Sequence, residues 1–270
     1  MPLQQVTDFR DEVAELDGLL SRLAAGDWAR PTAFKAWTTD DIVRHLHIGD
    51  TMALASATDP AAFTALIADI QAARATGLSR IEETRRRLDG LAGEALRRRW
   101  HATALELFAR LGAMPPDARL KWAGPDMGLR MFATARQMET WSHAQAIYDL
   151  LGIDRPAPSP RLRNVAELGV RTFGWAYRNR GLAVPPVMPS VRLDTPFGET
   201  WTWEQPGSDD RVEGPALDFC QVVTQTRNVA DTSLRVQGDG ARGWMAIVQC
   251  FAGPPEDPPA PGSRRAASAG

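Results

Sequence analysis

The stretch "MGLRMFATARQMETWSHAQAIYDLLG", residues 127–152, decides how the first half of the chain is interpreted. Its apolar residues recur every three or four positions, which predicts one long helix that ends at Gly152. Glu139 and His143 are four residues apart, so they project from the same helix face. Two interpretations stay open for this pair: two ligands of a metal ion, or an ordinary Glu–His contact on a helix surface.

Further helices are predicted before this one. Residues 7–26 carry apolar side chains at helical spacing. Thr38 is followed by Asp41 three positions later, which resembles a capping box at the start of a second helix. Pro60 begins a third helical region, which we expect to break at "DGLAG", residues 89–93. Four principal helical regions joined by connectors predict a four-helix bundle.

The predicted secondary structure changes from helices to a mixture of helices and strands after the Pro-rich segment "RPAPSPR", residues 155–161. This segment is the best candidate for a domain boundary. Beyond it we expect one helix, then a β-hairpin in "SVRLDTPFGETWTWEQP", then a helix, a short strand and a last helix in "GARGWMAIVQCFAG". We therefore predict a helical bundle at 1–154, a small α+β domain at 155–253 and a disordered tail at 254–270.

The composition narrows the functional class. The chain has 31 Lys and Arg against 33 Asp and Glu, and a net charge of −2 argues against a nucleic-acid partner. No apolar run approaches the ~20 residues of a membrane span, and the first residues lack the apolar core of a signal peptide. Cys220 and Cys250 lie in apolar, helix-like runs. This predicts two buried, reduced thiols in a cytoplasmic protein.

Two of the four histidines follow the predicted capping box. His45 comes three residues after Ile42 and is predicted to face the core, whereas His47 lies about 200° further round the helix and is predicted to be exposed. If His45 meets Glu139 and His143 inside the bundle, the imidazole and carboxylate groups would suit zinc or another first-row divalent ion. Three protein ligands leave positions for water or substrate, as in a catalytic metal site.

Two motifs in this order resemble those of a known family. "WTTDDIVRHL", residues 37–46, and "RQMETWSH", residues 136–143, are similar to motifs of the DinB-like, mycothiol-dependent maleylpyruvate isomerase superfamily. The resemblance implies a DinB-like bundle, a C-terminal α+β domain similar to sterol-carrier folds, and a metal triad of His45, Glu139 and His143. It also implies an enzyme that uses mycothiol or a similar thiol as cosubstrate, either as an S-transferase or as an isomerase.

The sequence departs from the family at one position. The isomerases carry an arginine after the last helix, suited to a substrate carboxylate, but "IVQCFAGPP" holds none. Arg227 or Arg242 could take this catalytic role, because a guanidinium fork fits a carboxylate, although surface arginines are common. Arg136 is expected either to orient the Glu139 carboxylate or to form a plain i,i+3 ion pair with it.

Two functions from different classes remain open at this stage. The first is the thiol-dependent enzyme, with its pocket between the bundle and the small domain, because ligand sites favour domain interfaces. The second is a non-catalytic protein whose small domain binds an apolar molecule and whose bundle metal is structural or vestigial. Retention of the metal together with thiol-linked turnover distinguishes the first function from the second.

Overall fold

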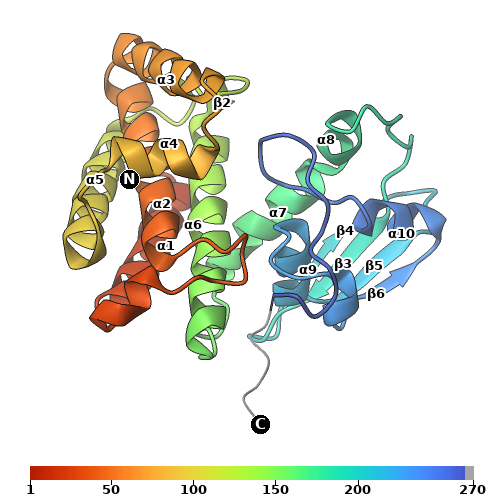
Figure 1. The fold of residues 1–270 in the computed structure, drawn as a ribbon. Coiled ribbons are helices and arrows are strands. Elements are labelled where there is room, and N and C mark those ends of the chain that lie inside the picture. Colours follow the sequence, from red (N-terminus) through yellow and green to blue (C-terminus); the bar gives the residue numbers. More distant parts are fainter. Residues whose placement is uncertain (265–270) are drawn as a thin grey trace. The chain divides into compact units, whose positions relative to one another are not determined.

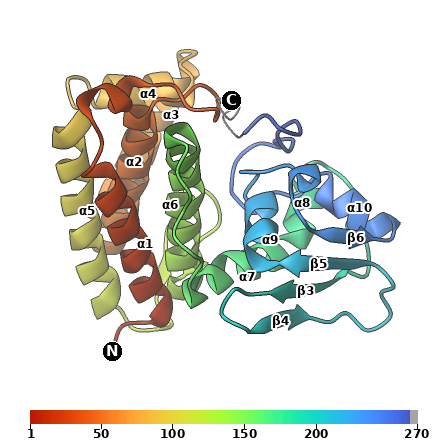
Figure 2. The same cartoon turned by 90° about the horizontal axis from the view of Figure 1, so that it is seen from below.

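A computed structural model describes residues 1–264 of the chain. The chain divides into two compact units, Met1–Leu150 and Leu151–Gly270, and each is described by itself. The predicted fold class, a helical bundle followed by a small α+β part, is confirmed (Figures 1 and 2). Within residues 1–264, no helix combines the length and the apolar character that a membrane span requires.

The first unit is helical apart from a small hairpin (Figure 1). Its elements are α1 (Gln4–Leu20), a 3-10 turn η1 (Ala25–Ala29), α2 (Thr39–Thr58), α3 (Pro60–Ala75), α4 (Arg80–Arg87), α5 (Gly93–Ala113), β1 (Arg119–Leu120), β2 (Met127–Gly128) and α6 (Leu129–Leu151). The long helices α1, α2, α5 and α6 form the predicted bundle, and the shorter α3 and α4 connect α2 to α5.

Local sequence signals account for where these helices begin and end. The Thr38 hydroxyl accepts a hydrogen bond from the Asp41 amide, and the Asp41 carboxylate accepts one from the Thr38 amide, so the predicted capping box starts α2. The third helical region breaks near Gly90 as expected. It also breaks near Gly77, where the backbone takes a φ of +96°. A positive φ is accessible to glycine at little cost, so the two breaks divide this region into α3, α4 and α5.

The second unit pairs a four-stranded sheet with short helices (Figure 2). Its elements are η2 (Pro160–Leu162), α7 (Arg163–Arg171), α8 (Phe173–Arg178), β3 (Ser190–Asp194), β4 (Thr200–Trp203), β5 (Arg211–Pro215), α9 (Ala216–Val223), η3 (Val229–Asp231), β6 (Arg235–Gln237) and α10 (Asp239–Met245). The strand order is β4-β3-β5-β6; β3 and β5 run parallel, and the other two pairs are antiparallel.

One face of this sheet is buried and the other is exposed. Val191 and Leu193 of β3 are buried, whereas Arg192 and Asp194 between and beyond them are exposed, as strand alternation requires. Helix α9 packs against β3 and β5. Helix α7 approaches α9 closely because Gly169 has no side chain: a Cβ there would lie 2.8 Å from a methyl group of Val223. The core of the second unit therefore lies between the sheet and its helices.

Several details of the second unit differ from the expectation. The hairpin and the short strand are confirmed as β3–β4 and β6. The single expected helix at its start is two helices, α7 and α8, separated at Thr172. The last predicted helix ends at Met245, so Cys250 lies in irregular chain, and its amide donates to the Val223 carbonyl. Strand β5 was not predicted, because "RVEGP" is short and contains a glycine that weakens the strand signal.

Residues 254–264 of the segment predicted as a disordered tail contain no helix or strand, but they are hydrogen-bonded to earlier residues of the second unit. Gln225 donates to the Glu256 carbonyl, Asn228 donates to the Pro259 carbonyl, and the Gly262 amide donates to the Asp231 carboxylate. These hydrogen bonds, rather than a hydrophobic core within the segment, attach it to the rest of the second unit. The remainder of the predicted tail, 265–270, lies outside the described residues.

Candidate metal centre

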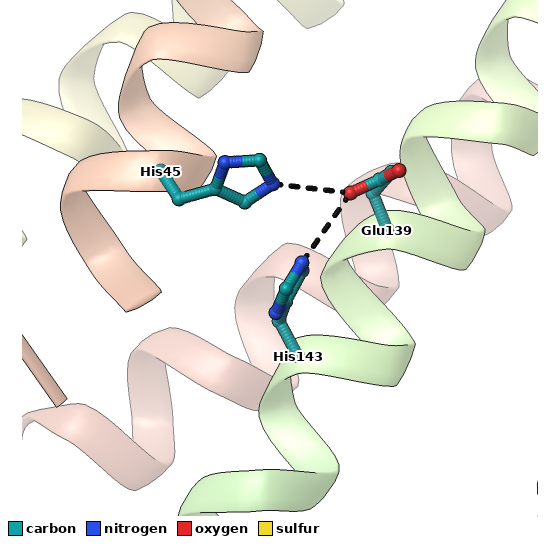
Figure 3. Close-up of side chains that lie close together, drawn as sticks. All are labelled: His45, Glu139 and His143. Carbon is teal, nitrogen blue, oxygen red and sulfur yellow. Dashed lines mark hydrogen bonds and ion pairs between the residues drawn. The ribbon is translucent and has the colours of Figure 1, made fainter. Parts of the chain in front are cut away.

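Three side chains meet between α2 and α6 (Figure 3). His45 comes from α2, and Glu139 and His143 come from adjacent turns of α6. His45 Nε2 lies 3.3 Å from Glu139 Oε2, and His143 Nε2 lies 3.5 Å from the same oxygen. One ligand atom from each residue lies within 4.8 Å of the other two. The structure therefore brings Glu139 and His143 together with His45, which precedes Glu139 by 94 residues.

The three side chains are mostly enclosed but reach the surface. Their exposed fractions are 16% for His45, 26% for Glu139 and 12% for His143. Burial is the main cause that lowers the pKa of His45 to about 4, and the charge of His143 acts in the same direction. The imidazole of His45 is therefore neutral at neutral pH and keeps a free lone pair on one ring nitrogen.

The Glu139 carboxylate is ionised at the same pH. Burial alone would raise its pKa, but hydrogen bonds from His143 and His45 outweigh burial and hold the pKa well below the usual value. A neutral imidazole and a carboxylate anion are the forms in which these groups bind divalent metals. His45 and Glu139 are thus in the forms that bind a divalent ion at neutral pH.

The spacing of the donors fits a small divalent ion. Zinc binds imidazole nitrogen and carboxylate oxygen at about 2.0–2.2 Å in tetrahedral geometry, which places neighbouring ligand atoms roughly 3.3–3.5 Å apart. The two measured His–Glu separations, 3.3 Å and 3.5 Å, match that tetrahedral edge. Three protein ligands would leave a fourth position open for water or substrate, and each of the three side chains is partly exposed.

His47 is not where the sequence placed it. The prediction of an exposed His47 is wrong, because only 5% of this residue is exposed. Helix α2 packs against α5 as well as lying beside α6, so two of its faces are covered. The prediction placed His47 by its angle from Ile42 and so allowed for only one buried face. Burial, followed by the charge of Arg99 on α5, lowers the pKa of His47 to about 4.

Arg136 is buried and bonds to α2 rather than to Glu139. Its Nη2 lies 3.0 Å from Asp50 Oδ1, and its Nε donates to the same oxygen at 3.1 Å. The expectation that Arg136 orients or pairs with Glu139 is therefore wrong. The reason is Gly49: a Cβ at this position would lie 2.7 Å from the guanidinium, so only glycine leaves room for it. Asp50, which the sequence could not place, also accepts a hydrogen bond from Trp100 Nε1.

Sequence reasoning missed three residues that lie near the triad. Trp37 and Phe34, which precede α2, pack their rings against the two imidazoles. Arg80, the first residue of α4, adds a positive charge that contributes to the lowered pKa of His45. Trp37 is the first residue of the motif "WTTDDIVRHL", which also contains His45, so the sequence offered a signal for this residue. Phe34 and Arg80 lie outside both motifs, so no sequence pattern connects them with the triad.

The two arginines predicted to act in catalysis lie in the second unit. Arg227 is buried, and its Nη1 donates to the Thr226 carbonyl. Arg242 is on the exposed side of α10, where its Nη2 lies 2.6 Å from Asp239. The triad belongs wholly to the first unit and both arginines to the second, and the catalytic roles of Arg227 and Arg242 stay predictions.

Comparison with known proteins identifies relatives of both sequence and structure. The model of the mycothiol maleylpyruvate isomerase N-terminal domain matches residues 9–148. Two uncharacterized proteins from strains of Mycobacterium tuberculosis, MT0041 and Rv0036c, are each 38% identical over 250 residues, covering 93% of this chain and 96% of theirs.

Two crystal structures share the fold at low sequence identity. The mycothiol-dependent maleylpyruvate isomerase is 14% identical, with a TM-score of 0.56 over 88% of this chain and 93% of that chain. A mutant of that isomerase is 15% identical, with a TM-score of 0.53 over 82% and 88%. At this level of identity, the likeness establishes a shared fold.

Proposed function

Because the chain belongs to the family of the mycothiol maleylpyruvate isomerase N-terminal domain, we propose that it is a metal-dependent enzyme that uses mycothiol or a similar small thiol. The observation that carries the proposal is the convergence of His45, Glu139 and His143 at the spacing of a tetrahedral site. Zinc is the ion we propose, since its preferred ligands and distances fit this donor set.

The proposed chemistry begins with the thiol. A free alkyl thiol has a pKa of about 8.5 and is mostly protonated at neutral pH. A bound dication deprotonates a coordinated thiol and so supplies a thiolate nucleophile. The chain's own residues contribute a neutral His45 and an ionised Glu139, which are the forms of these groups that bind a divalent ion. The partial exposure of all three side chains is consistent with access by a small thiol.

Two reactions are open to a thiolate held at this site. In isomerisation, sulfur adds to one carbon of an activated double bond, and the electron pair of that bond moves toward the activating carbonyl. Rotation about the resulting single bond, followed by loss of the thiolate, restores the double bond in the other geometry. In S-transfer, the thiolate forms a carbon–sulfur bond while a leaving group departs with its electron pair. Neither reaction requires an oxidant or a reductant.

An arginine of the second unit completes the proposal by binding a substrate carboxylate. Arg242 is the better candidate because its guanidinium is exposed and its partner Asp239 is fully exposed, so exchange of one carboxylate for another costs little. Arg227 is 4% exposed and would have to be uncovered first. The fork geometry of arginine suits a planar carboxylate in either case.

Metal analysis of the natively purified chain tests the metal centre. We expect about one divalent ion per chain, lost in His45→Ala and in His143→Ala. His101→Ala is the matched control, because His101 lies on the same unit, with 32% of its side chain exposed, outside the triad. Full metal retention in both triad variants, or no metal in the wild type, contradicts the site.

Thiol consumption then tests the activity. The wild type, supplied with mycothiol and an activated alkene or an alkyl electrophile, should turn over and should stop when a chelator removes the metal. Alkene isomerisation without net thiol loss would identify an isomerase, and stoichiometric thiol loss an S-transferase. A stoichiometric metal with no thiol-linked turnover on any electrophile would indicate the non-catalytic binding protein instead.

A further inference from the structure

The segment between η1 and α2, Pro31–Thr38, forms a closed loop that we name the aromatic strap. Pro31 and Thr38 form an isolated antiparallel bridge at its ends. The Thr32 amide donates to the Trp37 carbonyl at 2.8 Å, and the Trp37 amide donates to the Phe34 carbonyl at 2.9 Å. The strap therefore has its own hydrogen-bonded frame, and it ends on the residue that caps α2.

The tip of the strap adopts a backbone conformation that its residues disfavour. Lys35 and Ala36 have φ values of +53° and +54°, in the left-handed region that residues with a Cβ rarely enter. Both are exposed, so packing of their own side chains does not account for this conformation. Disfavoured backbone that persists in this way is concentrated at functional sites. Here the two residues turn the chain so that Phe34 and Trp37 on either side point to the triad.

The two strap rings contact both imidazoles of the triad. The Trp37 indole is parallel to the His143 ring, with 4° between the planes and 5.8 Å between the centroids. The same indole meets the His45 ring at 60° and 5.4 Å. Phe34 meets His143 edge-on, at 80° and 5.2 Å, and packs against Trp37 at 83° and 5.1 Å. Two rings of the strap thus contact His143, and one contacts His45.

Metal-binding histidines are usually oriented in another way. The ring nitrogen that does not bind metal normally donates to a carboxylate or a carbonyl, which fixes the plane of the imidazole. Within residues 1–264, the Nδ1 atoms of His45 and His143 make no such hydrogen bond to a protein group. Aromatic contacts of the observed geometry are each worth a measurable attraction and exclude other ring orientations by contact. The aromatic contacts of the strap are therefore the interactions that restrain the planes of the two imidazoles here.

We propose that Phe34 and Trp37 are positioning residues that fix the planes of His143 and His45, so that both Nε2 atoms face Glu139 before any metal arrives. The inference deepens the proposed function, since it rests on the triad being a metal site. A preformed donor set binds more tightly, because the rings lose no rotational freedom on binding. Removal of the Trp37 ring should therefore weaken metal binding without removing a ligand.

Metal affinity of the metal-free protein tests the proposal. Zinc is titrated against a chromophoric chelator for the wild type and the variants Trp37→Ala, Trp37→Phe and Trp122→Ala. We expect Trp37→Ala to raise the Kd about 10- to 100-fold, the range seen when groups that orient metal ligands are removed. Trp37→Phe keeps a flat ring and should recover most of the affinity. Trp122 is a half-buried tryptophan of the same unit that packs on Phe132, so its variant controls for general loss of packing.

Imidazole nitrogen and proton NMR on the metal-free protein provides the second measurement. The wild type should show one set of resonances for each triad ring, whereas Trp37→Ala should show exchange between ring orientations, with circular dichroism unchanged. A Kd for Trp37→Ala within about threefold of the wild type, or an equal loss in Trp122→Ala, overturns the proposal. If the wild type binds no zinc, the proposed function fails. The NMR measurement then tests the positioning role of the strap by itself. If the two imidazole rings are equally fixed in the wild type and in Trp37→Ala, that role is refuted.

Discussion

Arg136→Met should destabilise the first unit severely, because it leaves the Asp50 carboxylate buried without its cation. The Asp50 side chain is 0% exposed and that of Arg136 is 4% exposed. The guanidinium supplies the contacts at 3.0 Å and 3.1 Å to Asp50 Oδ1. Among residues 1–264, only the Trp100 indole would then continue to donate to this carboxylate. Methionine fills much of the same volume, so the lost charge, rather than a cavity, dominates the effect.

The expected magnitude follows from the burial of the pair. Removal of one partner of a buried ion pair costs about 3–5 kcal/mol. In a unit of this size, that corresponds to a fall in Tm of roughly 6–20 °C. Replacement of both partners by uncharged side chains is often nearly neutral. We therefore expect the double variant Asp50→Asn with Arg136→Met to recover at least half of the lost free energy of unfolding.

The pH dependence of the loss identifies its cause. Burial raises the pKa of Asp50, and Arg136 and the Trp100 indole act against that rise, whereas the charge of Glu139 adds to it. Without Arg136 the pKa rises further, so the folded protein binds a proton more readily than the unfolded chain. Stability in such a case falls as the pH rises through the folded pKa. The cost of Arg136→Met should thus be larger at pH 8 than at pH 5.

Urea unfolding of the metal-free protein at both pH values provides the test. Hydrogen exchange in peptides from α2 and α6 reports the first unit separately from the second. The two buried histidines titrate in the wild type and in the variant alike, so their contribution cancels in the difference. A loss below about 1 kcal/mol, or a loss that does not change between pH 5 and pH 8, would refute the assignment of a buried ion pair that links the two helices.

Two further predictions concern the N-terminal cap of α2 and the two buried histidines of this helix. Asp41→Ala removes half of the capping box and an ion pair with Arg85 at 2.6 Å, and should lower the free energy of unfolding by about 1–3 kcal/mol. Asp11→Ala, which breaks an exposed pair, should change it by less than about 0.5 kcal/mol; equal effects would contradict the role of the cap. His45 and His47 both have folded pKa values of about 4, so the unfolded chain takes up protons first as the pH falls below about 6.5. In the presence of chelator, each of these two histidines should lower the free energy of unfolding by about 2 kcal/mol between neutral pH and pH 5. His47→Gln should remove roughly half of this decrease. A wild type whose free energy of unfolding rises toward pH 5 would contradict these pKa directions.

The sequence by itself determined the features that depend on neighbours within a few residues. The capping box of Thr38 and Asp41, the break near Gly90 and the shared face of Glu139 and His143 all follow from local hydrogen bonding and the helical repeat. The motif around His45 supplied the third candidate ligand through its resemblance to the family. These local signals suffice to predict the helices, because each is encoded within one short segment. The meeting of His45 with Glu139, 94 residues later, was expected only through the resemblance.

Only the tertiary structure decided which groups lie beside the triad. His47 is buried because α2 is covered on two faces, and Arg136 reaches Asp50 across 86 residues because Gly49 leaves it room. The Trp37 indole lies on His143 because two exposed residues hold the strap in left-handed backbone. Such contacts depend on the space left between packed elements, which is a property of the assembled core. No periodicity or spacing along the chain records that space.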